Sequence, residues 1–150
     1  MNATSGGPGR PLKRSIAVAV RDAGGRLLVV KRADDDESLP GVWGLPAATS
    51  YDGEDAAATV ARIGRQKLGV TLRLGAHVGT ESDDRTGYAI RLDEYTAEVT
   101  GGTPEAPQPD TSVSQYATCA YVTDPAILRE AARRGSLCSR IYLRSAGLTW

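Results

Sequence analysis

Short apolar runs alternate with polar, turn-rich segments along most of the chain, and this pattern predicts a protein built largely of β-strands. Strands are predicted over five segments: 15–21, 26–32, 70–80, 87–99 and 114–122. The first two runs are separated by Asp22-Ala23-Gly24-Gly25, which is typical of a hairpin. A polar turn is predicted at 81–86, and a short extended segment at 41–46.

The segment 55–68 instead has the apolar spacing of an amphipathic helix. Asp55 can cap its N-terminus, and Gly69 stands where a left-handed residue commonly ends a helix. Gly64 inside the segment is unusual, because glycine in a helix costs about 1 kcal/mol relative to alanine. We therefore expect Gly64 either to admit a close neighbour or to be a weak point of the helix.

Two shorter helices are predicted near the C-terminus, over 125–134 and 136–145, with Gly135 between them. Residues 1–12 are rich in glycine, serine and proline, which predicts a flexible N-terminal tail. No repeat or long linker divides the remainder, so we expect 13–150 to form a single domain. Strands and helices together predict an α/β (α+β) fold with a mixed β-sheet.

The composition excludes some classes of function. The 150-residue chain has a formal net charge of zero at pH 7, which argues against bulk electrostatic binding to nucleic acid or to an anionic membrane. It has neither an apolar run of the ~20 residues that a membrane span needs nor the apolar core of a signal peptide. We therefore expect a soluble, cytoplasmic protein. Its cysteines, Cys119 and Cys138, form no C-x-x-C pair and are expected to be small buried apolar groups, since a thiol nucleophile would have only His77 as an imidazole partner.

A longer motif runs through 27–70. A strand ending in Lys31-Arg32 is followed by the run PGVWGLP at 40–46, then by a loop and the helix. This arrangement resembles the Nudix hydrolases. The resemblance implies a Nudix-type α/β/α sandwich, and the order of strands and helices over 13–147 agrees with that fold.

The Nudix signature is G-x5-E-x7-R-E-U-x-E-E-x-G-U, where U is a bulky aliphatic residue, and it can be placed on this chain from Ala48 onward. Glu54, Arg62 and the closing Gly69-Val70 match the signature. The resemblance implies that the three glutamates of the R-E-U-x-E-E stretch lie on one helix face, where they gather magnesium. In this chain those three positions are Ile63, Gln66 and Lys67.

No metal site is therefore predicted on the helix, because one carboxylate position is apolar, one is a neutral amide and one is a cation. Magnesium or manganese could bind only if its ligands came from outside the helix. Two acidic sets could supply such ligands: Asp34, Asp35, Asp36 and Glu37 in one loop, and Glu81, Asp83, Asp84, Asp93 and Glu94 further along. A charged, solvated loop is the alternative interpretation of both sets.

Glu54 and Lys67 are the candidate catalytic residues. The resemblance implies that Glu54 pairs with Arg62 and ties the loop to the helix. Two interpretations of Lys67 stay open: its charge replaces part of the role of the metal, or it is a solvated lysine favoured by the helix dipole. The candidate substrate-binding residues are Arg32, Trp43, Arg62, Ile63 and Gln66. For Trp43, a place in the core is the alternative.

Three functions are compatible with these observations. The resemblance names a hydrolase of nucleoside diphosphate-linked or related phosphorylated small molecules, with the usual magnesium site lost. A metal-independent enzyme that uses the old Nudix site on another small molecule is the second, and a non-catalytic ligand-binding protein is the third. The expected partner is a small molecule and not nucleic acid or a membrane. The C-terminal arginines are expected to form a solvated face, with an anion site or a homodimer contact as the alternative: Arg129, Arg133, Arg134, Arg140 and Arg144.

Overall fold

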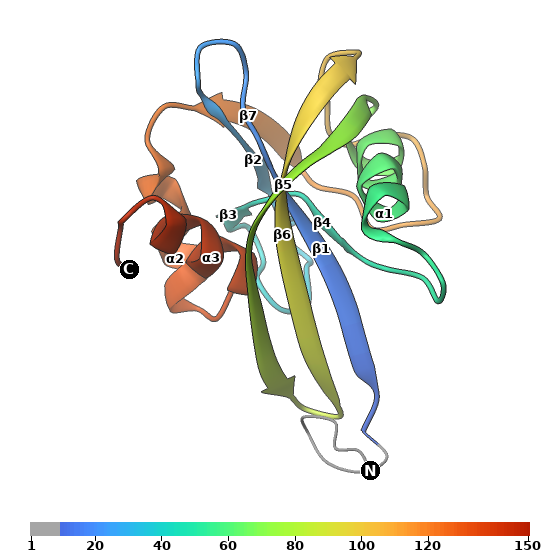
Figure 1. Cartoon of the computed structure of the whole chain (residues 1–150), viewed down its shortest axis with the longest axis vertical. Coiled ribbons are helices and arrows are strands. Elements are labelled where there is room, and N and C mark those ends of the chain that lie inside the picture. Colours follow the sequence, from blue (N-terminus) through green and yellow to red (C-terminus); the bar gives the residue numbers. More distant parts are fainter. Residues whose placement is uncertain (1–9) are drawn as a thin grey trace.

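A four-stranded sheet forms the centre of the fold in this computed structural model, which describes residues 10–150 (Figure 1). Its strands lie in the order β4 (Ala47–Thr49), β1 (Leu12–Val20), β6 (Tyr88–Gly101) and β5 (Thr71–Arg85). β1 and β6 run parallel, whereas the other neighbours are antiparallel, so the predicted mixed sheet is confirmed. Residues 1–9 of the predicted tail lie outside the described part, and the tail cannot extend to residue 12, because β1 begins at Leu12.

A second, three-stranded antiparallel sheet has the order β3 (Trp43–Gly44), β2 (Leu27–Lys31) and β7 (Thr118–Val122). The predicted hairpin between β1 and β2 is only partly correct. The chain does turn at 22–25, where Gly25 has a φ of 80°. The two strands then enter different sheets and meet at a single bridge between Arg21 and Leu27.

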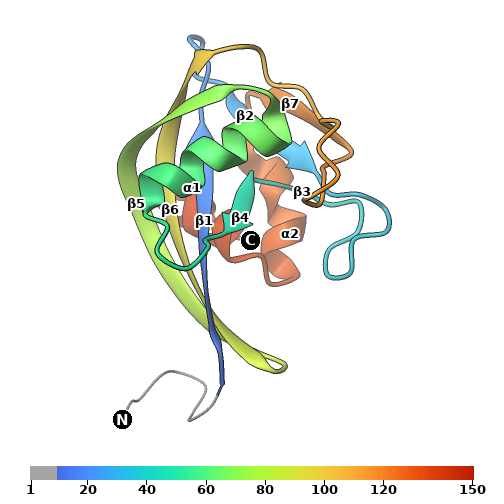
Figure 2. The same ribbon diagram turned by 90° about the vertical axis from the view of Figure 1, so that its right-hand side faces the viewer.

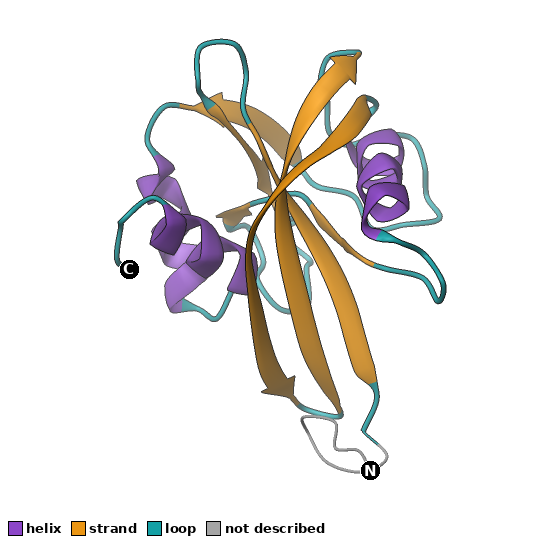
Figure 3. Cartoon of the chain, in the orientation of Figure 1, coloured by secondary structure: helices purple, strands orange, loops and turns teal. Residues whose placement is uncertain are grey.

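Helices cover both faces of the four-stranded sheet (Figures 2 and 3). α1 (Ala56–Ile63) lies on one face and continues as a π-helical turn, η1 (Gly64–Leu68). On the other face, a 3₁₀ turn η2 (Pro125–Leu128) leads into α2 (Arg129–Arg133), and α3 (Leu137–Ser145) follows. No helix within residues 10–150 combines the length and the apolar character that crossing a membrane requires.

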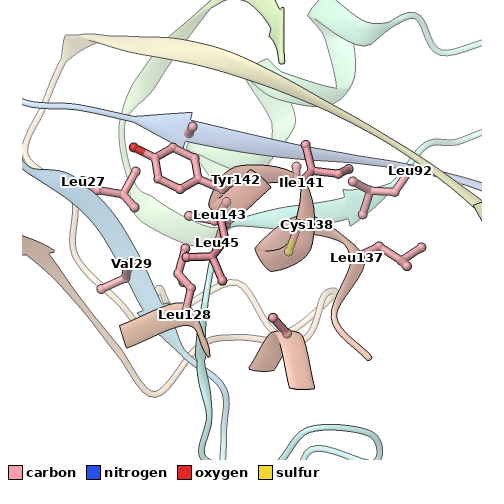
Figure 4. Close-up of a cluster of buried hydrophobic side chains, with 13 residues drawn as sticks. Leu27, Val29, Leu45, Leu92, Leu128, Leu137, Cys138, Ile141, Tyr142 and Leu143 are labelled. Carbon is pink, nitrogen blue, oxygen red and sulfur yellow. The ribbon is translucent and has the colours of Figure 1, made fainter. Parts of the chain in front are cut away.

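Alternating side chains of β1 build a core on each side of the sheet, as the period of a strand requires. Val18 and Val20 pack toward α1 with Ile63 and Leu68. Ala17 and Ala19 face the opposite way, into a second cluster with Leu45, Leu92 and the apolar face of α3: Leu137, Cys138, Ile141, Tyr142 and Leu143 (Figure 4). The expectation that Cys138 is a buried apolar group is confirmed, while Cys119 is only half-buried.

The predicted turn at 81–86 is wrong. β5 continues to Arg85 and pairs with β6 as far as Tyr88, so the chain reverses at Thr86-Gly87, where Gly87 has a φ of 82°. Polar residues at 81–84 suggested a turn, but they belong to a largely exposed part of this long hairpin, where polar side chains are compatible with a strand. Thr86-Gly87 is the two-residue connection that such a hairpin favours.

Of the two interpretations of Gly64, the structure supports the close neighbour: Val70 and Leu72 leave no room for a side chain at this position. A Cβ at this position would lie 2.8 Å from the Val70 carbonyl oxygen and 2.9 Å from Leu72 Cγ. We expect Gly64→Ala to lower the free energy of unfolding by about 1–3 kcal/mol, despite the better helix propensity of alanine. The matched control is Gly44→Ala, since no atom lies within 4 Å of a Cβ there. Urea unfolding that shows equal stabilities for the two variants would contradict this account.

Candidate functional site

The loop before α1 is tied to that helix by an ion pair between Glu54 and Arg62, as predicted. Arg62 donates from Nε to Glu54 Oε2 and from Nη2 to Glu54 Oε1, both at 2.9 Å. Glu54 Oε1 also accepts from the Tyr51 N–H at 3.0 Å and from the Thr59 hydroxyl at 2.8 Å. These bonds, with those from Arg62 first, outweigh burial and lower the pKa of Glu54 to about 2. Glu54 is therefore a carboxylate whose oxygens are both engaged.

Arg62 is enclosed, with 7% of its surface exposed. Its Nη2 donates to the Thr49 carbonyl at 2.7 Å, and its Nη1 donates to Gln66 Oε1 at 3.4 Å. The Tyr51 ring covers the guanidinium, with 3.9 Å between the Arg62 Cζ and the ring centre. Arg62 thus joins the end of β4, the loop and the helix, and its donors point at the protein.

Lys67 lies beside β4, at the helix position where the Nudix signature has its last glutamate. Its Nζ donates to the Ala47 carbonyl at 3.0 Å and lies 5.0 Å from the centre of the Tyr116 ring. The Tyr116 hydroxyl accepts from the Ala47 N–H at 2.9 Å and donates to the Ala47 carbonyl at 3.2 Å. We call these three residues the Lys67 cluster. Lys67 is only 9% exposed, so the interpretation as a solvated lysine is wrong.

Burial governs the titration of the Lys67 cluster. Burial first, and then the charges of Arg32 and Arg62, lowers the pKa of Lys67 to about 8, against the opposing effect of Asp36. Burial also raises the pKa of Tyr116 to about 12, so its hydroxyl keeps its proton. At neutral pH the cluster therefore presents an ammonium group that donates to a neutral carbonyl.

Arg32 follows directly after β2 and lies near Trp43 of β3, since Lys31 pairs with Trp43 and the Arg32 N–H donates to the Val42 carbonyl. Trp43 is half-buried and packs against the core cluster on the α3 side, which favours a place in the core. Arg32 donates from Nε to Asp36 Oδ2 at 3.1 Å, and 36% of its side chain is exposed. Arg32 therefore remains accessible to a ligand from the solvent.

The three positions of the missing glutamates do not converge. Ile63 is 1% exposed and packs in the core with Leu68, so it does not reach a surface where a substrate could bind. Gln66 accepts from Arg62, whereas Lys67 points toward β4. The π-helical turn separates them, because its hydrogen bonds span five residues, as from the Gly69 N–H to the Gly64 carbonyl.

The donors of this helix do not suit magnesium. Magnesium favours octahedral coordination by carboxylate, phosphate and water oxygens. Ile63 has no donor atom, the Lys67 ammonium repels a cation, and the Glu54 oxygens are engaged. In the part of the chain from residue 10 onward, no group of three or more histidine, cysteine, aspartate or glutamate side chains could hold a metal ion. The signature helix therefore does not fit the metal that the resemblance implies.

Of the two acidic sets that could supply outside ligands, Asp36 and four members of the second set make other contacts. In the loop 34–37, burial opposes the ionisation of Asp36, but the Leu39 and Ser38 N–H groups and Arg32 lower its pKa to about 2. Four members of the second set each pair with a different basic side chain: Glu81 with Arg144, Asp83 with Arg85, Asp84 with Arg10, and Asp93 with His77. Glu94, the fifth, is fully buried.

The roles of Tyr116 and Glu94 were missed by sequence reasoning. Tyr116 bonds with Ala47, which lies 69 residues earlier, so no local pattern could have indicated the contact. Glu94 did carry a signal. It lies two residues after Leu92, and alternation along a strand places both on one face, which here is the core face toward α3.

A groove of about 500 Å³ lies on the α1 side of the four-stranded sheet, beyond the N-terminus of α1. It is lined by the start of β1, by the loop 49–54, and by Asp93 and Tyr95 of β6. Among the predicted site residues Glu54 lines this groove, whereas Lys67 and the others do not. The groove and the Lys67 cluster are thus separate features.

The comparisons with known proteins agree with this architecture. A NUDIX hydrolase from Nitrosomonas europaea matches with a TM-score of 0.70 at 13% identity, over 92% of this chain and 89% of that one. The MutT protein from Methanosarcina mazei matches with a TM-score of 0.65 at 16% identity, over 94% of this chain and 97% of that one. An ADP-ribose pyrophosphatase from Streptococcus suis matches with a TM-score of 0.56 at 16% identity, over 74% and 73%. At these identities the likeness shows a shared fold.

No curated protein matches the chain. The family model for the NUDIX domain matches residues 11–134, which is most of the sequence and includes both the Glu54–Arg62 pair and the Lys67 cluster. The chain therefore belongs to the NUDIX domain family.

Proposed function

We propose that the chain is a Nudix-type hydrolase of a nucleoside diphosphate-linked or related phosphorylated small molecule, and that it works without magnesium on the signature helix. The substrate class is supported by family membership and by the likeness to an ADP-ribose pyrophosphatase. The observation that carries the proposal is the buried Lys67 ammonium, which occupies a position where the signature has a glutamate.

In this proposal the Lys67 ammonium supplies the fixed positive charge that offsets phosphate charge in the transition state. A charge held away from water acts more strongly than one in solvent. An ammonium has three donors, and Ala47 uses one of them, which leaves donors for a phosphate oxygen. Arg32 supplies a second cation on the solvent side. Glu54 and Arg62 act as positioning residues that hold the loop against the helix.

The test is a turnover screen with ADP-ribose, nucleoside diphosphate sugars and nucleoside triphosphates, each with magnesium, manganese or EDTA, and with products identified by mass. We expect turnover in EDTA, and we expect Lys67→Met to reduce it about a hundredfold, as the loss of one well-placed donor does. Lys13→Met is the matched control, because Lys13 is exposed and lies over the Tyr88 ring. Turnover that requires magnesium would overturn the proposal.

The pH dependence gives an independent readout of Lys67. Because its pKa is about 8, the ammonium is present below that pH and is lost above it. Turnover, or the binding of pyrophosphate, should therefore weaken as the pH rises through about 8, and this step should be absent in Lys67→Met. A step that persists in the variant would assign it to another group.

A second candidate is a ligand-binding protein without catalysis. One observation favours it: Glu54, the carboxylate that remains of the signature, has both oxygens engaged by protein donors. The same screen separates the two functions. Binding of ADP-ribose that depends on Lys67, with no product under any condition, would support the second candidate over the first.

A further inference from the structure

Glu94 on β6 is a buried acid that the fold does not use. Its side chain is 0% exposed, and neither carboxyl oxygen has a hydrogen-bond partner. Among the buried side-chain nitrogen and oxygen atoms of residues 10–150, only these two oxygens have no hydrogen-bond partner. Most buried polar groups in folded proteins are hydrogen-bonded, because leaving one unpaired is costly. Glu94 therefore destabilises the fold and makes no side-chain hydrogen bond that would offset this.

The elements around Glu94 offer it no partner. In the sheet its neighbours in register are Ala17 on β1 and Gly79 on β5, neither of which has a polar side chain. α3 closes the site from above: Ile141 lies over Gly79, where a Cβ would be 2.9 Å from its Cγ2. Cys138 lies in the same core cluster as Ala17 and Ile141. Figure 4 shows Cys138 and Ile141 on this face of α3.

In these surroundings Glu94 is an uncharged carboxylic acid. Burial raises its pKa to about 9, so the proton stays on at neutral pH. A protonated carboxyl group offers an O–H donor and a carbonyl acceptor side by side. Its complement is a planar edge on which an acceptor stands next to an N–H donor. Nucleobases present such edges, whereas phosphates and simple sugars do not.

Glu94 is also connected to the Lys67 cluster. Cys138 and Leu45 belong to one core cluster, and Ala47 packs against it. Ala47, which binds Lys67, follows Leu45 by two residues, and an extended chain advances roughly 3.3 Å per residue. One short extended segment thus runs from the neighbourhood of Glu94 to the Lys67 cluster.

We infer that Glu94 is the residue that selects the ligand of this protein, by pairing with the donor–acceptor edge of a nucleobase whose phosphates lie at the Lys67 cluster. This inference rests on the proposed function for the position of the phosphates. Because Glu94 is enclosed, the base reaches it only when the contact between Leu45 and Cys138 opens. Glu94 then exchanges its unpaired state for two hydrogen bonds to the ligand.

The test is calorimetric titration with GMP, AMP and UMP, and with ribose 5-phosphate, which differs from them in lacking the base. We expect the wild-type protein to bind at least one nucleotide about tenfold or more tightly than ribose 5-phosphate, and Glu94→Met to lose this preference. Affinity for inorganic pyrophosphate should be unchanged in the variant. Glu94→Gln keeps a donor and an acceptor and should keep part of the preference. Glu98→Met, at an exposed position further along the same strand, is the matched control.

The outcomes separate this inference from the proposed function. A preference that Glu94→Met leaves intact, or no preference in the wild-type protein, overturns the inference even if pyrophosphate binds in a Lys67-dependent way. If pyrophosphate does not bind but free guanosine or uridine does, and Glu94→Met abolishes that binding, the phosphate site is wrong and the assignment of Glu94 stands. Failure of every nucleoside and nucleotide to bind also overturns the inference.

Discussion

Replacement of Arg62 by alanine is expected to lower the free energy of unfolding by about 3–5 kcal/mol, as the loss of one member of a buried ion pair does. The change removes two hydrogen bonds to Glu54 and one to the Thr49 carbonyl. Arg62 is 7% exposed, so water replaces these bonds poorly, and Glu54 keeps a charge in an enclosed place. The measurement is urea unfolding at neutral pH, followed by far-UV circular dichroism.

The matched control is Arg73→Ala, which breaks another arginine–glutamate pair. Arg73 binds Glu98 on the surface, where the two side chains are 71% and 62% exposed. Exposed pairs contribute about 0–1 kcal/mol, because water and salt screen them. If both variants lose the same stability, burial of the Glu54–Arg62 pair does not matter and this assignment of Arg62 is wrong.

Glu94→Met is expected to stabilise the protein, and the gain should increase as the pH rises. Between pH 4.5 and about 9, Glu94 holds a proton in the folded chain that the unfolded chain releases. Folding therefore takes up a proton in this window, and stability falls with pH by as much as about 1.4 kcal/mol per pH unit. Methionine has a similar size and no group to desolvate, so the variant should lack this slope. Thermal and urea unfolding at about pH 5 and about pH 8 measure it.

Two other groups, Cys138 and Lys67, have shifted pKa values near this pH range, and both are present in the wild-type protein and in Glu94→Met. The buried thiol of Cys138 packs near Glu94, and its pKa lies above its ordinary value. Lys67 has a pKa of about 8 when folded and 10.5 when unfolded, so it makes stability rise with pH between those values. Both groups are present in the wild-type protein and in Glu94→Met. Their contributions therefore largely cancel when the free energy of unfolding of one protein is subtracted from that of the other. An equal pH slope in the two proteins would mean that Glu94 is ionised in the folded state.

Local pattern predicted most strands and the central helix, because these depend on alternation, helical spacing and capping residues such as Asp55. It could not predict β4, whose three small residues Ala47–Thr49 become a strand only by pairing with β1. It also placed the turn of the long hairpin too early, since exposed strands and turns share polar residues. The division of the strands between two sheets is likewise a tertiary property.

The candidate site was predictable where the signature itself carried the contact, as for Glu54 with Arg62. It was not predictable where the outcome depended on burial. Ile63 and Lys67 were expected on one helix face, but Ile63 is in the core and Lys67 donates to a strand carbonyl. Tyr116 reaches the same carbonyl from a distant part of the sequence. Whether an ammonium or a phenol is buried beside a backbone carbonyl is decided by packing, which the sequence does not state locally.

The π-helical turn after Ile63 changes which residues of this helix lie on the same face, and a redesign of its chemistry has to allow for this. Across residues 64–68 the residue that shares the core with Ile63 is Leu68, five positions on, and not Lys67, four positions on. A glutamate introduced at the spacing of a regular helix would therefore face a different neighbour from the one intended. A metal-binding helix designed here has to follow the spacing of the wide turn, because the turn, and not side-chain identity alone, determines which positions meet.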